Sequence, residues 1–119
     1  MSSDLDTLTQ QLRQFAQARD WEQFHAPKNL SMAISIEAAE LMEHFQWLSE
    51  AQSKQLNDQQ HQDIRHEMAD IFLYLLRLAD QLNIDLIASA EEKMRINEKK
   101  YPVEQARGRA DKYTAYTQE

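Results

Sequence analysis

Apolar side chains recur every three or four positions along most of this chain, which is the spacing that places them on one face of a helix. Asp85 stands where the N-cap of the last such segment is expected. The pattern predicts an all-α fold with four helices. They are expected over about 4–19, 29–48, 58–82 and 85–100.

Residues that interrupt helices are rare in the sequence. Gly108 is the single glycine, and Pro27 and Pro102 are the two prolines. A fold of strands and tight turns would need more of both. Pro27 is expected to separate the first two helices, because the residue before a proline disfavours helix. The polar segment 50–57 should join the second and third helices as an antiparallel pair.

These features predict a four-helix bundle in a single domain over 1–119, with a helical core of about 4–100 and a polar tail of 101–119. The 119 residues include no cysteine, which excludes disulfides and thiolate metal sites. The longest apolar run is too short to span a membrane, and no secretory signal is evident. With 20 acidic residues against 13 Lys and Arg, the net charge of −7 disfavours nucleic acid as a partner. We therefore expect a cytoplasmic protein without membrane or nucleic-acid contacts.

Carboxylates interrupt the apolar pattern of the second and third helices. In "SMAISIEAAELMEHFQW", Glu37 and Glu40 are three residues apart, and in "EMADIFLYLL" Glu67 and Asp70 repeat that spacing. In an antiparallel pair, Glu40 and Glu67 would each lie about 13 Å from the connecting loop. The two acidic pairs can therefore face each other across a helical hairpin.

Such pairs have more than one explanation. In a chain this acidic, a pair three residues apart is often a solvated helix face. Carboxylates gathered among apolar side chains, however, repel each other and lose hydration unless a cation neutralises them. Hard oxygen ligands select Mg²⁺, Mn²⁺ or Ca²⁺, and several ions would suit a phosphate-bearing substrate. Spacing alone leaves both interpretations open.

A di-iron bundle is a third alternative, and the sequence argues against it. Ferritin-like sites need a Glu-x-x-His motif on each of two helices. Glu22 and His25 form the single such motif, and they lie beside the break at Pro27. The remaining histidines do not complete the pattern; they are His44, His61 and His66.

Four segments carry a resemblance to a known family. They are "RDWEQFHAPKNL", "EAAELMEHFQW", "EMADIFLYLL" and "KMRINEKKYPVEQARGRADKY", which occur in order between about Leu8 and Tyr113. Together they resemble the MazG-like all-α nucleotide pyrophosphohydrolases, in the dCTP pyrophosphatase branch.

The resemblance implies an enzyme of nucleotide-pool sanitation. It would hydrolyse a nucleoside triphosphate, dCTP or a modified dCTP first, to the monophosphate and pyrophosphate. The implied cofactor is Mg²⁺, with Mn²⁺ as an alternative. The implied metal ligands, which are also the catalytic residues, are Glu37, Glu40, Glu67 and Asp70.

The resemblance also implies substrate-binding residues. Lys93 and Asn97, one turn apart on the fourth helix, would meet the phosphates or the sugar, and Arg109 is a weaker candidate. The base pocket would be built by Trp21, His25, Trp47 and Tyr74. Each has an ordinary structural alternative, since tryptophans usually pack in cores and Lys93 could be a plain surface lysine.

One residue departs from the pattern of that branch. Some members carry a histidine where this chain has Leu12, which puts strict cytosine specificity in doubt. A broad-specificity nucleoside triphosphate pyrophosphatase is therefore an alternative. A non-catalytic, metal-binding helical oligomerisation module is another. In either case we expect a homo-oligomer, because the helices carry more apolar surface than a monomeric bundle can bury. The family resemblance implies that this oligomer is a tetramer built as a dimer of dimers.

Overall fold

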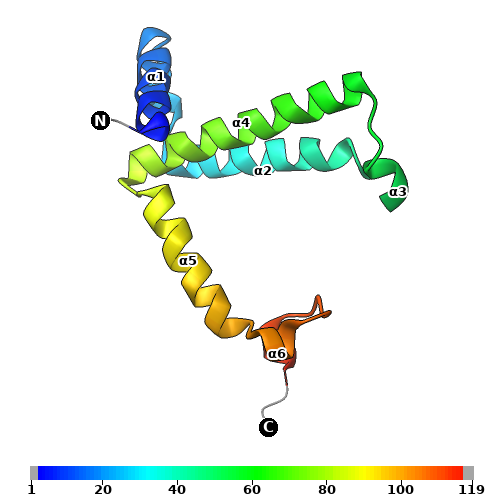
Figure 1. Cartoon of the computed structure of the whole chain (residues 1–119). Coiled ribbons are helices and arrows are strands. Elements are labelled where there is room, and N and C mark those ends of the chain that lie inside the picture. The colour runs from blue at the N-terminus through cyan, green and yellow to red at the C-terminus, as the bar shows by residue number, and fades with distance from the viewer. Residues whose placement is uncertain (1–2, 117–119) are drawn as a thin grey trace. The chain divides into compact units, whose positions relative to one another are not determined.

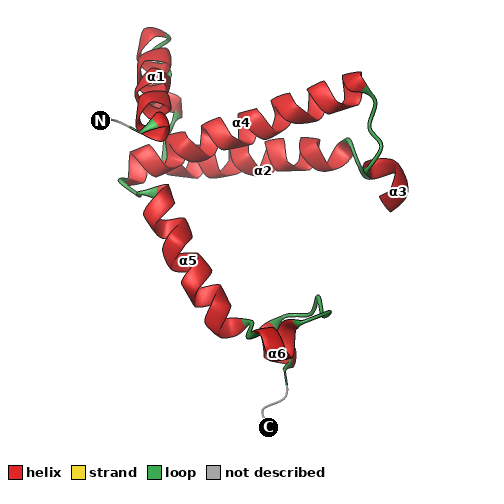
Figure 2. Ribbon diagram, in the orientation of Figure 1, coloured by secondary structure: helices red, strands yellow, loops and turns green. Residues whose placement is uncertain are grey.

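Helices connected by short loops form the chain throughout residues 3–116, which are the residues that the computed structural model describes (Figure 2). No strand occurs in this range, so the predicted all-α fold is confirmed. The elements in order are α1 (Asp4–Ala18), the 3-10 turn η1 (Glu22–Phe24), α2 (Pro27–Glu43), α3 (Glu50–Ser53), α4 (Asp58–Leu82), α5 (Leu86–Lys100), α6 (Val103–Ala106) and η2 (Tyr113–Ala115).

The chain groups into two compact units, one ending at Ile84 and one beginning at Asp85. The first contains α1, α2, α3 and α4, and the second contains α5 and α6. The single domain and the four-helix bundle stay predictions. Within the described residues, no helix is both long and apolar enough to cross a membrane.

In the first unit, α2 and α4 run side by side as an antiparallel hairpin, and α1 packs against α4 (Figure 1). Asn57 caps the start of α4 by accepting a hydrogen bond from the Gln60 N–H, while the Gln60 side chain accepts one from the Asn57 N–H. Asn83 ends α4 in the left-handed conformation with φ of 54°. Both caps fall at the bounds that the sequence predicts.

The second helix is shorter than predicted. It begins with Pro27 at its first position, where a proline costs no hydrogen bond, and it ends at Glu43 rather than near residue 48. The final turn tightens, since the Phe45 N–H donates to the Met42 carbonyl and the Leu48 N–H donates to that of Phe45. Ser49 then caps α3, which occupies part of the predicted 50–57 loop.

Five apolar side chains are buried in the first unit, and they come from α1, α2 and α4. They are Ala16, Leu30, Ile64, Leu76 and Ala79. Many larger apolar side chains of the same hairpin stay exposed, including Met32, Ile36, Met42, Met68 and Phe72. The buried core is therefore small for the apolar content of these helices.

The second unit begins as the sequence predicts. The Asp85 side chain accepts a hydrogen bond from the Ala88 N–H at 3.0 Å and so caps α5. The ring of Tyr101, which directly precedes Pro102, packs edge-on against the rings of Tyr113 and Tyr116 in the tail, each with its centroid 5.9 Å away.

Candidate functional site

Three carboxylates meet between the two helices of the hairpin. Glu37 comes from α2, and Glu67 and Asp70 come from successive turns of α4. One oxygen from each lies within 4.8 Å of the others, which is close enough for a single cation to contact all three. Glu40 lies one turn further along α2, is exposed, and is not among these three. We call Glu37, Glu67 and Asp70 the carboxylate cluster.

The electrostatics of this cluster favour a positive ligand. A hydrogen bond to Glu67, partial burial and the neighbouring Glu40 together raise the pKa of Glu37 to about 8. Glu67 Oε1 is buried, and among the described residues no donor reaches it. His44 Nε2 lies 4.0 Å from the other oxygen, Oε2. The donor set consists of hard oxygens, so the residues present fit Mg²⁺ or Mn²⁺.

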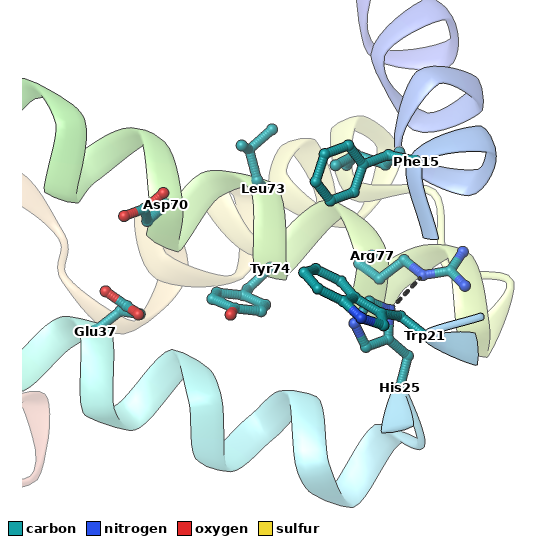
Figure 3. A pocket seen from close by; sticks show the side chains of 9 residues that line it. Phe15, Trp21, His25, Glu37, Asp70, Leu73, Tyr74 and Arg77 are labelled. Atoms are coloured by element: carbon teal, nitrogen blue, oxygen red, sulfur yellow. Dashed lines mark hydrogen bonds between the residues drawn. The ribbon is translucent and has the colours of Figure 1, made fainter. Parts of the chain in front are cut away.

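A cavity of about 260 Å³ adjoins the cluster within the first unit. Glu37 and Asp70 stand at one end of it, and Trp21 and His25 stand at the other, with Tyr74 between them (Figure 3). Its volume lies just below the range of about 300–1,000 Å³ that is usual for small-molecule sites. The space therefore suits a small group placed beside the carboxylate cluster.

Aromatic rings form the far end of the cavity. Phe15 and Trp21 meet edge-on with centroids 5.6 Å apart, and the Trp21 and His25 centroids are 6.3 Å apart. Phe15 is on α1, whereas Trp21 and His25 flank η1 in the connection to α2. Rings from two different segments of the chain thus create an apolar wall suited to a heteroaromatic ring.

A chain of polar contacts fixes His25. Arg77 Nε donates to His25 Nδ1 at 3.2 Å, and Arg77 Nη1 donates to Asp80 Oδ2 at 3.3 Å. Arg13 of α1 binds the same Asp80 carboxylate through two nitrogens, one of them 2.7 Å away. Arg13 also lowers the pKa of Asp80, so this carboxylate stays ionised. Burial and the nearby Arg77 charge lower the pKa of His25, which favours the neutral imidazole.

The structure brings together Trp21, His25 and Tyr74 with the carboxylate cluster. Trp47 is elsewhere: its side chain is 87% exposed in the turn that follows α2, and it does not line the cavity. Lys93 and Asn97 lie one turn apart on α5 of the second unit. The functional roles of all these residues stay predictions.

Arg109, the weaker substrate-binding candidate, contacts residues of its own segment. Arg109 pairs with Asp111, and its guanidinium carbon lies 4.7 Å from the Tyr116 ring centroid.

The cavity is also lined by Leu12, Phe15, Leu73 and Arg77. Arg77 follows Asp70 by seven residues and Tyr74 by three, so all three lie on one face of α4. This spacing could have predicted that Arg77 lines the cavity. Leu12, where some relatives were expected to carry histidine, does reach the cavity wall.

Comparison with known proteins identifies the class. The sequence model of the MazG-like family matches residues 32–115, and the chain belongs to this family. The chain is 39% identical to a pyrophosphatase from Archaeoglobus fulgidus DSM 4304, whose crystal structure superposes with a TM-score of 0.81. That match covers 86% of this chain and 95% of the archaeal one.

Curated relatives support the expected branch. The chain is 41% identical to dCTP pyrophosphatase 1 of Rattus norvegicus and 38% identical to that of Homo sapiens, over 103 residues and 85% of its length in each case. It matches 61% of each relative and so spans about three fifths of their length. The predicted resemblance to dCTP pyrophosphatases is confirmed.

Proposed function

We propose that this protein is a divalent-metal-dependent nucleoside triphosphate pyrophosphohydrolase that prefers dCTP or modified dCTP. The observation that carries the proposal is the carboxylate cluster, whose oxygens lie within 4.8 Å of one another and whose Glu37 and Asp70 line one end of an aromatic cavity. An acidic site would take the cation-bound phosphates, and the cavity would take the base. The similarity to enzymes named dCTP pyrophosphatase supports the same reaction.

The carboxylate cluster would hold the cation, Mg²⁺ first and Mn²⁺ as an alternative. Glu40, one turn along α2 from Glu37, is proposed as the fourth ligand. When bound, the cation supplies Lewis-acid stabilisation of phosphate charge and activates water for attack at the α-phosphorus. In this proposal the four acids are both metal ligands and catalytic residues.

Glu37 and Tyr74 contribute to this site before a cation or a substrate is bound. Without a cation Glu37 keeps a proton at neutral pH, because its pKa is about 8, and this proton relieves repulsion within the cluster. Once a cation compensates the charge, Glu37 is free to ionise. Tyr74 lies between the cluster and the aromatic wall, so we place it beside the sugar.

The aromatic end would bind the base. A pyrimidine is flat and small, and the Trp21 ring can stack against it while His25 contacts its polar edge. Trp47 does not line the cavity of its own chain, so its proposed place in the base pocket requires a second chain of the proposed oligomer. On the second unit, Lys93 and Asn97 are proposed to bind the phosphates or the sugar.

A homotetramer is part of the proposal, as is a cytoplasmic role in nucleotide-pool sanitation. The support for assembly is the set of large apolar side chains left exposed on the hairpin, such as Ile36, which is 60% exposed, and Met68, which is 57% exposed. A second chain covering them would remove apolar surface from water.

Substitution of Glu67 by Gln tests the site. Glu67→Gln keeps the shape but removes one negative charge, so we expect at least a 100-fold loss of Mg²⁺-dependent pyrophosphate release from dCTP. The matched control is Asp63→Asn, one turn earlier on α4, where an amide oxygen can still accept from Gln59. Asp63→Asn should keep the wild-type activity, and unchanged activity of Glu67→Gln would overturn the assigned site.

Broad base specificity is the second candidate, and Leu12 is the observation that favours it. Leucine at the cavity wall offers no hydrogen bond to a base. Comparing kcat/KM for dCTP, 5-methyl-dCTP, dUTP, dTTP and dATP decides between the two. A preference for cytosine above about tenfold supports the first candidate, and a flat profile supports the second.

A further inference from the structure

Arg77 is the one buried charged residue among residues 3–116, with 5% of its surface exposed. Burying a guanidinium is costly unless its charge and its N–H groups are satisfied. Asp80 compensates the charge, and Arg13 binds the other side of that carboxylate from α1. The remaining interaction of Arg77 is the hydrogen bond to His25 Nδ1 at 3.2 Å (Figure 3). The chain thus maintains a buried cation at the edge of the proposed base pocket.

This contact decides which ring nitrogen of His25 carries the proton. An arginine Nε–H can only donate, so His25 Nδ1 must accept and cannot hold a proton. The imidazole is therefore neutral, with its proton on Nε2. A protonated imidazolium would set a donor against the Arg77 donor, which is consistent with the lowered pKa of His25.

The second nitrogen is left for a ligand. His25 lines the cavity, and within the described chain no hydrogen bond to its Nε2 occurs. A fixed Nε2–H at that position offers a donor and never an acceptor. Cytosine presents acceptors at its O2 and N3 atoms, and so could meet that donor.

We propose that Arg77, supported by Asp80 and Arg13, is a positioning residue that holds His25 in its neutral Nε2–H form so that His25 donates to an acceptor atom of the cytosine base. This inference rests on the proposed function for the identity of the ligand. It assigns a specificity role to three residues outside the carboxylate cluster.

Nitrogen-15 NMR of the histidine side chains tests the first half without any turnover. In the wild type at pH 7, the signals of His25, identified by their loss in His25→Gln, should show an acceptor Nδ1 and a protonated Nε2. The Arg77→Gln, Asp80→Asn double variant leaves no unpaired buried charge and should show a mixture of tautomers. Protonated Nδ1 in the wild type, or an unchanged tautomer in the double variant, would overturn the proposed positioning of His25 by Arg77.

Titration with dCMP in EDTA tests the second half and needs no catalysis. The Nε2 signal should shift on binding, together with the Tyr74 ring signals. A shift of Tyr74 without a shift of Nε2, or no binding at all, would overturn the contact with the base.

Kinetics then separate positioning from a purely structural role. Loss of one hydrogen bond should raise KM for dCTP about 3- to 10-fold in the double variant while kcat changes less than about twofold. Arg65→Gln, an exposed arginine on the same helix, is the matched control and should leave both constants unchanged. An unaltered KM in the double variant would contradict the proposal. A wild type that hydrolyses no nucleotide would overturn the proposed function, whereas the NMR result on the tautomer of His25 would still test the role of Arg77 separately.

Discussion

Binding of a divalent cation to the carboxylate cluster should release a proton, and the structure gives the amount. Glu37 has a pKa of about 8 when no cation is present. A group with that pKa carries about 0.9 protons at pH 7, and a metal-bound carboxylate carries none. We therefore expect about 0.9 protons released per cation at pH 7 from the cluster as a whole.

The same raised pKa sets the direction of the pH dependence. Below pH 8 the cation must displace a proton, so apparent affinity rises with pH and levels off above about pH 8. Between pH 6 and pH 8 the protonated fraction falls from nearly all to half, which increases the apparent affinity about 50-fold. A cation bound at ordinary, already ionised carboxylates would show almost no change over this range.

Isothermal titration calorimetry of Mg²⁺ binding, in buffers with different ionisation enthalpies, measures the released protons directly. Glu37→Gln is the informative variant, because it removes the shared proton and should bring the release near zero. Asp63→Asn should release as much as the wild type. Proton release near zero in the wild type, with an affinity that does not depend on pH between 6 and 8, would refute this explanation of the cluster.

Three further outcomes follow from the fold and the proposed assembly. Leu30→Ala should lower the free energy of unfolding by about 2–5 kcal/mol in urea denaturation, since Leu30 is 1% exposed, while Lys28→Ala on the same helix should stay within about 0.5 kcal/mol; equal effects would contradict the assigned core. Asn57→Ala should cost about 1 kcal/mol through loss of the cap of α4, and no change in the denaturation midpoint would count against that cap. Light scattering coupled to size exclusion should give the mass of a tetramer, and a stable monomer would defeat the assembly.

Hydrophobic periodicity predicts a helix well where it agrees with the capping residues. At α4 and α5 the apolar pattern stops where Asn57, Asn83 and Asp85 provide caps, so the predicted bounds hold. At the end of α2 the pattern continues through Phe45 and Leu48, although the backbone there has already turned. Periodicity records where apolar side chains recur and does not detect hydrogen bonds that tighten a final turn.

For the site too, features that depend on helical spacing could be predicted from the sequence, whereas features that depend on the path of a connection could not. Glu37, Glu67 and Asp70 could be placed together because they depend on helical spacing and on one antiparallel hairpin. The contact between His25 and Arg77 joins residues 52 positions apart and depends on how the connection before α2 folds against α4. No local pattern encodes that path. Trp47 lies beyond the end of α2, so extrapolating a helical stripe could not give its position.

The central claim is hydrolysis of dCTP between its α- and β-phosphorus atoms, and phosphorus-31 NMR tests it most directly. Purified protein with dCTP and Mg²⁺ should yield dCMP and pyrophosphate in equal amounts, and EDTA should abolish the reaction. Formation of dCDP and inorganic phosphate, or persistence of unchanged dCTP with Mg²⁺ and with Mn²⁺, would contradict the account.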